Sequence, residues 1–96
     1  MIKHVVMWKF KEGTEAQMNE FLAGLQALNG VIPEILEMEV AKSAVPNSDY
    51  DAILVSKFES LEALDAYKVN PKHVAVADLC KSIRISRVAF DYDVLD

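Results

Sequence analysis

Two segments of the sequence alternate with the two-residue period of a β-strand, and both carry apolar side chains on both faces. In residues 2–10 one face carries Ile2, His4, Val6, Trp8 and Phe10, and the other carries Lys3, Val5, Met7 and Lys9. In residues 52–58, Ile53 and Val55 alternate with Leu54, so this segment also lacks a polar face. A strand of this kind belongs to a sheet that is covered on both sides. The fold must therefore supply two layers of cover.

The segments between and after these strands predict helices and two further strands. Residues 14–17 fit a capping box, with Thr14 as N-cap and Gln17 at the third position, before a helix that ends at Asn29-Gly30. Its apolar residues follow helical spacing: Met18, Phe21, Leu22, Leu25 and Leu28. Residues 36–40 predict a second strand and residues 42–50 a loop. Ser60 and Asn70 predict the N-caps of two more helices, the second reaching about Lys81, and residues 83–94 predict a long last strand.

The order of the predicted elements is β-α-β-β-α-β, with the second helical region split at Asn70-Pro71. This order predicts an α+β fold of the ferredoxin-like type, in which a four-stranded antiparallel sheet carries helices on one face. We expect residues 1–96 to form one domain. Val5, Met7, Ile53 and Val55 would then lie on the other face and would need cover. A homodimer whose two sheets pack face to face, as a barrel, supplies that cover.

Charge and composition exclude several classes of function. The chain has a net charge of −5, which argues against nucleic acid as a partner because phosphate binding needs clustered Lys and Arg. No apolar run has the length of a membrane span or the pattern of a signal peptide, so we expect a cytoplasmic protein without membrane partners. The single cysteine, Cys80, suits a reducing compartment, where it would act as a small buried residue. Without CxxC or HExxH spacing, no metal site is predicted.

Residues 67–74 contain the candidate for chemistry. Asn70 is a good N-cap and Pro71 suits the first helical position, so His73 is expected in the first turn of a helix. The partial positive charge of that turn disfavours imidazolium, which predicts a neutral His73 able to accept a proton. Tyr67 supplies a hydroxyl that can donate one. The alternatives are a structural His73 that bonds a backbone carbonyl and a Tyr67 that belongs to the core.

Further residues are candidates for the lining of a pocket between the helices and the sheet. His4 either lines a cavity or bonds a neighbour, because it is the one polar group on an apolar strand face. The other candidates can line the same pocket or simply fill it: Val6, Trp8, Phe21 and Leu25.

Several segments, in order and spacing, resemble the stress-responsive A/B barrel (Dabb) family. They are residues 3–10, Ile32-Pro33, Phe58-Glu59-Ser60, residues 67–74 and Phe90-Asp91-Tyr92. The resemblance implies a dimeric α+β barrel. The family includes plant polyketide cyclases that use a histidine as general base, a tyrosine that assists it, and a second histidine in the pocket wall. By resemblance these roles fall on His73, Tyr67 and His4, and no cofactor is implied.

Three functions remain open at this point. The first is a cofactor-independent lyase, cyclase or isomerase that acts on a small apolar or aromatic carbonyl compound through His73 and Tyr67. The second is a non-catalytic stress-response or ligand-binding protein, in which the histidines serve packing. The third, by analogy of fold alone, is a cofactor-independent monooxygenase-like enzyme.

Overall fold

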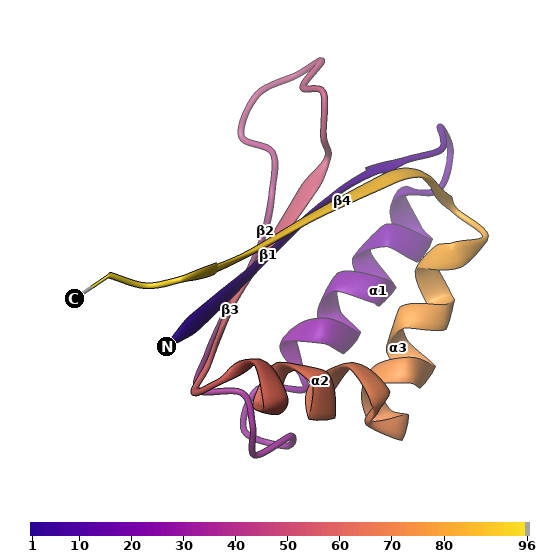
Figure 1. The fold of residues 1–96 in the computed structure, drawn as a ribbon. Helices are drawn as coiled ribbons and strands as arrows, with labels where there is room; N and C mark the ends of the chain where they lie inside the picture. The colour runs from indigo at the N-terminus through magenta and orange to yellow at the C-terminus, as the bar shows by residue number, and fades with distance from the viewer. Residues whose placement is uncertain (96) are drawn as a thin grey trace.

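The computed structural model describes residues 1–95 and has the predicted order of elements (Figure 1). They are β1 (Ile2–Phe10), α1 (Glu15–Gln26), β2 (Glu37–Lys42), β3 (Ala52–Phe58), α2 (Leu61–Val69), α3 (Pro71–Lys81) and β4 (Arg84–Asp93). The strands form one antiparallel sheet in the order β2-β3-β1-β4. The ferredoxin-like α+β prediction is therefore confirmed, with α2 and α3 together in the place of the second helix.

The helices cover one face of the sheet, here called the inner face (Figure 1). The β1 residues that point toward them alternate strictly with half-buried residues, and all five are buried: Ile2, His4, Val6, Trp8 and Phe10. Phe21 and Leu25 of α1 meet them in the core. A Cβ on Gly24 would lie 3.1 Å from Cγ1 of Val76, so this glycine allows α1 and α3 to approach closely.

The helix boundaries show which local signals act. Ser60 and Asn70 cap as predicted, since their side-chain oxygens accept hydrogen bonds from the backbone N–H groups of Ala63 and Lys72, at 3.2 and 2.9 Å. Thr14 is the N-cap residue of α1 as predicted, but the capping box does not form, because its hydroxyl donates to the Lys11 carbonyl at 2.6 Å and makes no bond to the helix. The first helix also ends three residues earlier than predicted, where the hydrogen bonds change to i→i−3 turns such as Leu28 N–H to Leu25 O.

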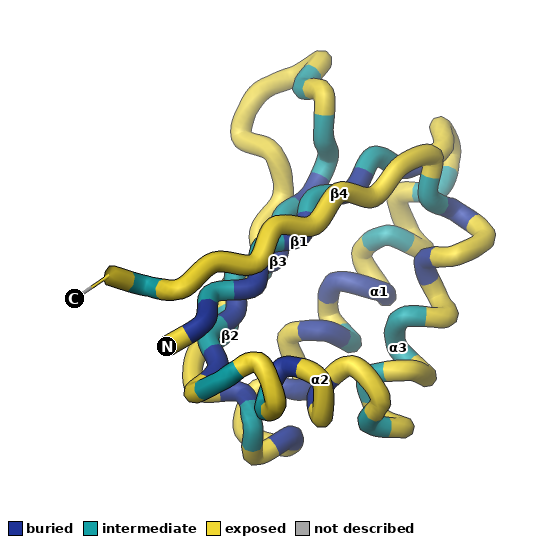
Figure 2. The backbone as a smooth tube through the Cα atoms, viewed as in Figure 1, coloured by how far each residue is buried: buried dark blue, intermediate teal, exposed yellow. Residues whose placement is uncertain are grey.

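The two edge strands also shift slightly from their predicted bounds. β2 runs over Glu37–Lys42 and continues two residues past the predicted end, into the segment expected to be a loop. β4 begins at Arg84, one residue later than predicted, and Ile83 lies in the turn after α3, where its carbonyl accepts from Lys11 N–H at 2.8 Å. Figure 2 shows β4 exposed along most of its length, as expected for an edge strand.

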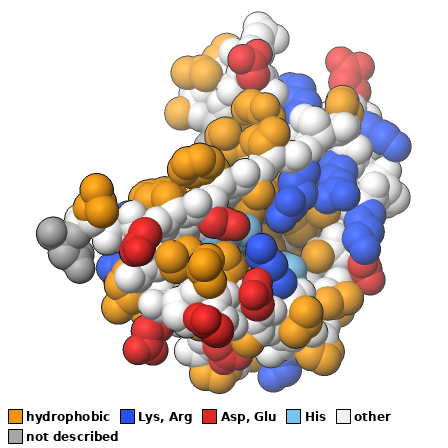
Figure 3. Space-filling model, viewed as in Figure 1, with side chains coloured by type: hydrophobic (Ala, Val, Ile, Leu, Met, Phe, Trp, Pro, Cys, Tyr) orange, Lys and Arg blue, Asp and Glu red, His pale blue; other side chains and the backbone are white. Residues whose placement is uncertain are grey.

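The outer face of the sheet, which points away from the helices, has an apolar centre. Register brings Val5 beside Val55 and Phe90, and Met7 beside Ile53 and Val88. We call these residues the outer sheet patch: Val5, Met7, Ile53, Val55, Val88 and Phe90. Phe90 is 68% exposed, and Figure 3 shows hydrophobic side chains along this side of the sheet. Apolar surface of this kind marks an interaction site.

Residues 1–95 show two absences that concern membranes and metals. No helix in that range combines the length and apolar character needed to cross a bilayer. Nor do three or more His, Cys, Asp or Glu side chains in that range gather as metal ligands would.

Candidate functional site

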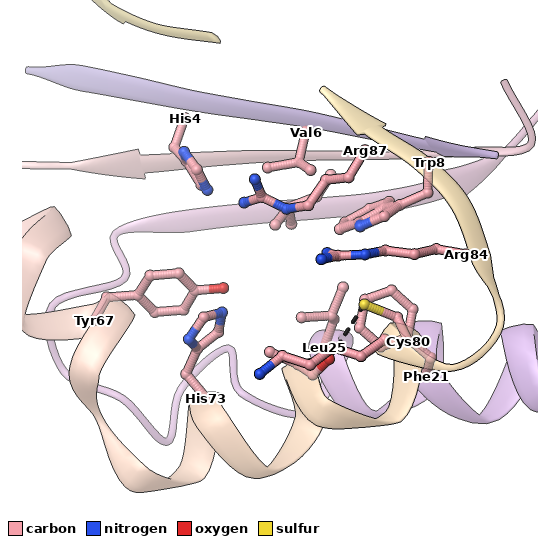
Figure 4. Close-up of a pocket in the computed structure, with 13 residues that line it drawn as sticks. His4, Val6, Trp8, Phe21, Leu25, Tyr67, His73, Cys80, Arg84 and Arg87 are labelled. Carbon is pink, nitrogen blue, oxygen red and sulfur yellow. Dashed lines mark hydrogen bonds between the residues drawn. The ribbon is translucent and has the colours of Figure 1, made fainter. Parts of the chain in front are cut away.

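A cavity of about 70 Å³ lies between the inner face of the sheet and the helices (Figure 4). Its wall contains every residue that the sequence nominated for a pocket or for catalysis: His4, Val6, Trp8, Phe21, Leu25, Tyr67 and His73. These residues come from β1, α1, α2 and α3. The fold therefore brings together side chains that are up to 69 positions apart, which is the separation of His4 from His73.

His73 stands in the first turn of α3, where the Asn70 cap and Pro71 begin the helix. Its Nδ1 lies 3.1 Å from the Lys68 carbonyl at the end of α2. A carbonyl only accepts, so Nδ1 carries the proton and Nε2 of the neutral ring keeps its lone pair. Burial lowers the pKa of His73, and the bond to the Lys68 carbonyl opposes this. The predicted neutral histidine agrees in direction, but burial is the leading cause.

Tyr67 of α2 is fully buried, and its ring packs on His73 with centroids 4.3 Å apart. Its other aromatic neighbours are Phe58, with centroids 5.1 Å apart, and His4, at 6.4 Å. Within residues 1–95 its hydroxyl has no hydrogen-bond partner, and Figure 4 shows the hydroxyl pointing into the cavity beside His73. Burial raises the pKa of Tyr67 to about 12, while the charge of Arg87 acts in the opposite direction. The ring therefore belongs to the core, as one alternative held, while the hydroxyl remains a protonated donor facing open space.

His4 of β1 is 3% exposed and both lines the cavity and bonds a neighbour. Its Nδ1–H donates to the Asp91 carboxylate, on the paired residue of β4. Lys68 lies on the other Asp91 oxygen, at 3.8 Å. Burial lowers the pKa of His4, and the hydrogen bond and charge of Asp91 raise it by less. The bond to Asp91 fixes the ring and leaves Nε2 as the free nitrogen.

The remaining predicted residues form an apolar wall. Trp8 packs edge-on against Phe21, with ring centroids 5.1 Å apart and planes at 88°. Val6 and Leu25 are each 1% exposed and complete this side. The Trp8 indole Nε1–H is buried without a hydrogen-bond partner in residues 1–95. This leaves a second unpartnered donor, in addition to the Tyr67 hydroxyl.

The sequence analysis missed the cationic side of the cavity. The additional lining residues are Leu54, Ala77, Cys80, Lys81, Arg84 and Arg87. Residues three apart on a regular strand point to opposite faces, yet Arg84 pairs with Phe10 and Arg87 with Trp8, both on the inner face. The pairing of Ser86 with Lys9 leaves Ile85 as an extra residue, which is a β-bulge. A signal was present, since the apolar residues of the last strand change phase between Ile85 and Val88.

Fold and cavity together define a ferredoxin-like α+β domain that holds a small cavity between its helices and its sheet. The family model for the Stress responsive A/B Barrel Domain (Dabb) matches residues 2–94, and the chain belongs to this family. The sequence resemblance is thereby confirmed.

Similar proteins include a cyclase, a stress-response protein and a protein of unknown function. The chain is 33% identical over 95 residues to olivetolic acid cyclase of Cannabis sativa, covering 95% of this chain and 94% of that protein. It is 26% identical to the stress-response A/B barrel domain-containing protein DABB1 of Arabidopsis thaliana, but spans only 46% of that protein. A dimeric ferredoxin-like protein of unknown function from Bacteroides fragilis superposes with a TM-score of 0.90 at 28% identity, covering 97% of this chain and 95% of that chain.

Proposed function

We propose that this protein catalyses cofactor-free acid/base chemistry on a small carbonyl compound in the cavity, with His73 as base and Tyr67 as hydrogen-bond donor. One observation carries the proposal: the Nε2 of His73 and the hydroxyl of Tyr67, which has no hydrogen-bond partner in residues 1–95, face the same cavity from rings 4.3 Å apart. The likeness to a cyclase supports the same class of reaction.

The proposed step moves one proton. Nε2 of His73 takes a proton from a carbon next to the carbonyl, and the electron pair of the C–H bond becomes the C=C bond of an enolate. The Tyr67 hydroxyl donates a hydrogen bond to the oxygen on which negative charge develops. The imidazolium then returns a proton to the same carbon, which restores the compound with an exchanged hydrogen, or to a different carbon conjugated with the enolate, which isomerises the compound. Alternatively the proton goes to the oxygen of a second carbonyl that the enolate carbon has attacked, which closes a ring. No oxidant or reductant is required.

Exchange of hydrogen for deuterium next to a carbonyl tests this step. Proton NMR in D₂O would follow acetone, acetophenone and pyruvate with the wild-type protein, with His73→Ala, and with Lys72→Ala as a control on the same helix. We expect the wild-type protein and the control to accelerate exchange of at least one compound, and His73→Ala to lose about 10²–10⁴-fold of that rate. Wild-type rates equal to the protein-free rates, or an unaffected His73→Ala, would refute the proposal.

We further propose that two copies of the chain pack through their outer sheet patches, which makes a dimeric α+β barrel. The apolar character of Val5, Val55 and Phe90 supports this, as does the dimeric description of the Bacteroides fragilis neighbour. A charge in the middle of such an interface is costly to desolvate. Light scattering should give a dimer for the wild-type chain and a monomer for Val5→Asp. Val69→Asp, at a site 74% exposed on α2, should stay dimeric. A wild-type monomer at micromolar concentration, or a dimeric Val5→Asp, would contradict the interface.

A non-catalytic binding role is the second candidate, because the hydrogen bond from His73 to the Lys68 carbonyl also joins the end of α2 to the start of α3. In that case the histidine serves structure, and His73→Ala should lower the free energy of unfolding by about 1–3 kcal/mol. Urea unfolding of the wild type and the variant measures this cost. An unchanged stability together with lost exchange activity would favour the catalytic role.

A further inference from the structure

We infer that the cavity takes a small oxo acid, whose carboxylate is bound by Arg84 and Arg87 while its carbonyl group reaches Tyr67 and His73. This inference rests on the proposed function for the reaction, and it adds the substrate class. The sequence alone suggested an apolar or aromatic carbonyl ligand, which needs no charged partner.

The first observation is an excess of positive charge at the cavity of a chain whose net charge is −5. Lys81, Arg84 and Arg87 all line the cavity. Lys81 is paired with Asp78 at 2.8 Å, but no carboxylate of residues 1–95 lies within 4.0 Å of either guanidinium. Figure 3 shows the basic side chains gathered beside β4. Two arginines without carboxylate partners beside a cavity offer a site for an external anion.

The second observation is the bulge that turns both arginines to the same side. Without the extra residue Ile85, one of the two would point to the outer face. Figure 4 shows both guanidinium groups extending from β4 over the cavity, across from Tyr67 and His73. Burial raises the pKa of Tyr67 and lowers that of His73, and in both cases the charge of Arg87 acts to lower the pKa. The positive charge of Arg87 is therefore within electrostatic reach of both residues. The same charge would stabilise the proposed enolate.

The third observation is the balance of donors and acceptors in the wall. Trp8 Nε1–H and the Tyr67 hydroxyl are buried donors without partners in residues 1–95, from residues 3% and 0% exposed. Together with the two guanidinium groups, these donors outnumber the two free acceptor nitrogens, which are Nε2 of His4 and Nε2 of His73. Buried polar groups normally find partners, so the ligand should bring acceptors. A carboxylate and a carbonyl supply three oxygens, all of them acceptors.

The size of the cavity sets the scale of the acid. A volume of about 70 Å³ is well below the roughly 300–1,000 Å³ of pockets for drug-sized ligands. This favours an acid of few carbon atoms, with its carboxylate at the arginines.

Pyruvate is a suitable probe, and Trp8 is a built-in reporter because it is the only tryptophan of the chain. The indole Nε1–H gives a single ¹H–¹⁵N resonance from the cavity wall. Its shift would be followed during titration with pyruvate, and with methyl pyruvate as the uncharged match, at constant ionic strength. We expect saturable binding of pyruvate that is at least about tenfold tighter than that of the ester, as for loss of a charge-assisted hydrogen bond.

The variants separate the arginines from general charge. Arg87→Met and Arg84→Met should each weaken pyruvate binding about tenfold or more and leave binding of the ester unchanged. Lys72→Met removes one positive charge from α3 at an exposed position that does not line the cavity, and should bind as the wild type does. Equal affinity for pyruvate and its ester, no saturable binding of either, or full affinity in both arginine variants would overturn the inference.

Binding and exchange fail independently. If wild type and both arginine variants distinguish acid from ester as expected but His73→Ala still exchanges deuterium at the wild-type rate, the proposed function fails and the carboxylate site stands. If neutral ketones exchange in a His73-dependent way while pyruvate binds no better than its ester, the proposed function stands and the carboxylate site fails.

Discussion

Replacing Tyr67 with phenylalanine removes a single oxygen atom from a fully buried aromatic side chain. The ring is 0% exposed and packs against Phe58 and His73, and phenylalanine keeps all of these contacts. The hydroxyl makes no hydrogen bond within residues 1–95. The substitution therefore tests whether the oxygen serves the fold or the cavity.

The expected magnitude follows from the missing partner. Leaving a buried polar group unsatisfied costs about 1–3 kcal/mol, so a fold that gains nothing from the hydroxyl should not lose stability without it. We expect Tyr67→Phe to leave the free energy of unfolding unchanged or to raise it by up to about 2 kcal/mol. Tyr67→Ala, which also removes the ring, should lower it by about 3–5 kcal/mol.

Urea unfolding of the wild type and both variants, at one protein concentration, measures these differences. In a domain of 96 residues each 1 kcal/mol corresponds to about 4–8 °C in Tm, so thermal unfolding resolves the same changes. Tyr67→Phe should also lose about 10²–10³-fold in the exchange reaction, the usual effect of removing a donor to a developing oxyanion. If Tyr67→Phe lowers stability by more than 1.5 kcal/mol, a value within the range for a lost hydrogen bond, the hydroxyl has a structural partner and the reasoning is wrong.

Three further predictions concern pH and packing. The pKa values of His4 and His73 lie below the ordinary 6.5, mainly because of burial. As pH falls, these histidines are therefore protonated at a higher pH in the unfolded chain than in the folded chain. The free energy of unfolding should be highest above pH 6.5 and decline below it, and unchanged urea midpoints at about pH 7.5 and 5.5 would refute this. Asp91→Asn should lower the pKa of His4 further, because the carboxylate now raises it; a rise in an NMR titration would contradict the assigned pair. Gly24→Ala should raise the free energy of unfolding by about 1 kcal/mol, through helix propensity, only when Val76→Ala has relieved the 3.1 Å contact. An equal effect of Gly24→Ala in the wild-type and Val76→Ala proteins would argue against that contact.

Most of the fold was predictable because its signals are local. The alternation of residues 2–10 and the caps at Ser60 and Asn70 each depend on side chains within one element. Thr14 shows the limit of such signals. Its residue type and spacing suit a cap, but the turn before it offers the Lys11 carbonyl as a competing acceptor for its hydroxyl.

Most of the candidate site was predictable because the inner face of β1 and the break before Asn70 were visible in the sequence. A period-two strand places His4, Val6 and Trp8 on one side whatever the fold around it. The sequence did not show which residues of β4 point to the inner face of the sheet. Its apolar residues change phase, but only pairing with β1 shows that Ile85 is the extra residue and that Arg84 and Arg87 share a face.

The sequence by itself thus determined the order of elements, an apolar sheet face that needs cover, and a neutral histidine next to a tyrosine. These depend on neighbours along the chain, where propensity and periodicity act. Only the tertiary structure decided that burial is the main cause of the lowered pKa of His73, that the Tyr67 hydroxyl meets no partner among residues 1–95, and that two arginines face the same cavity. Desolvation and unmet hydrogen bonds depend on residues far apart in sequence, so they exist only once the helices pack on the sheet.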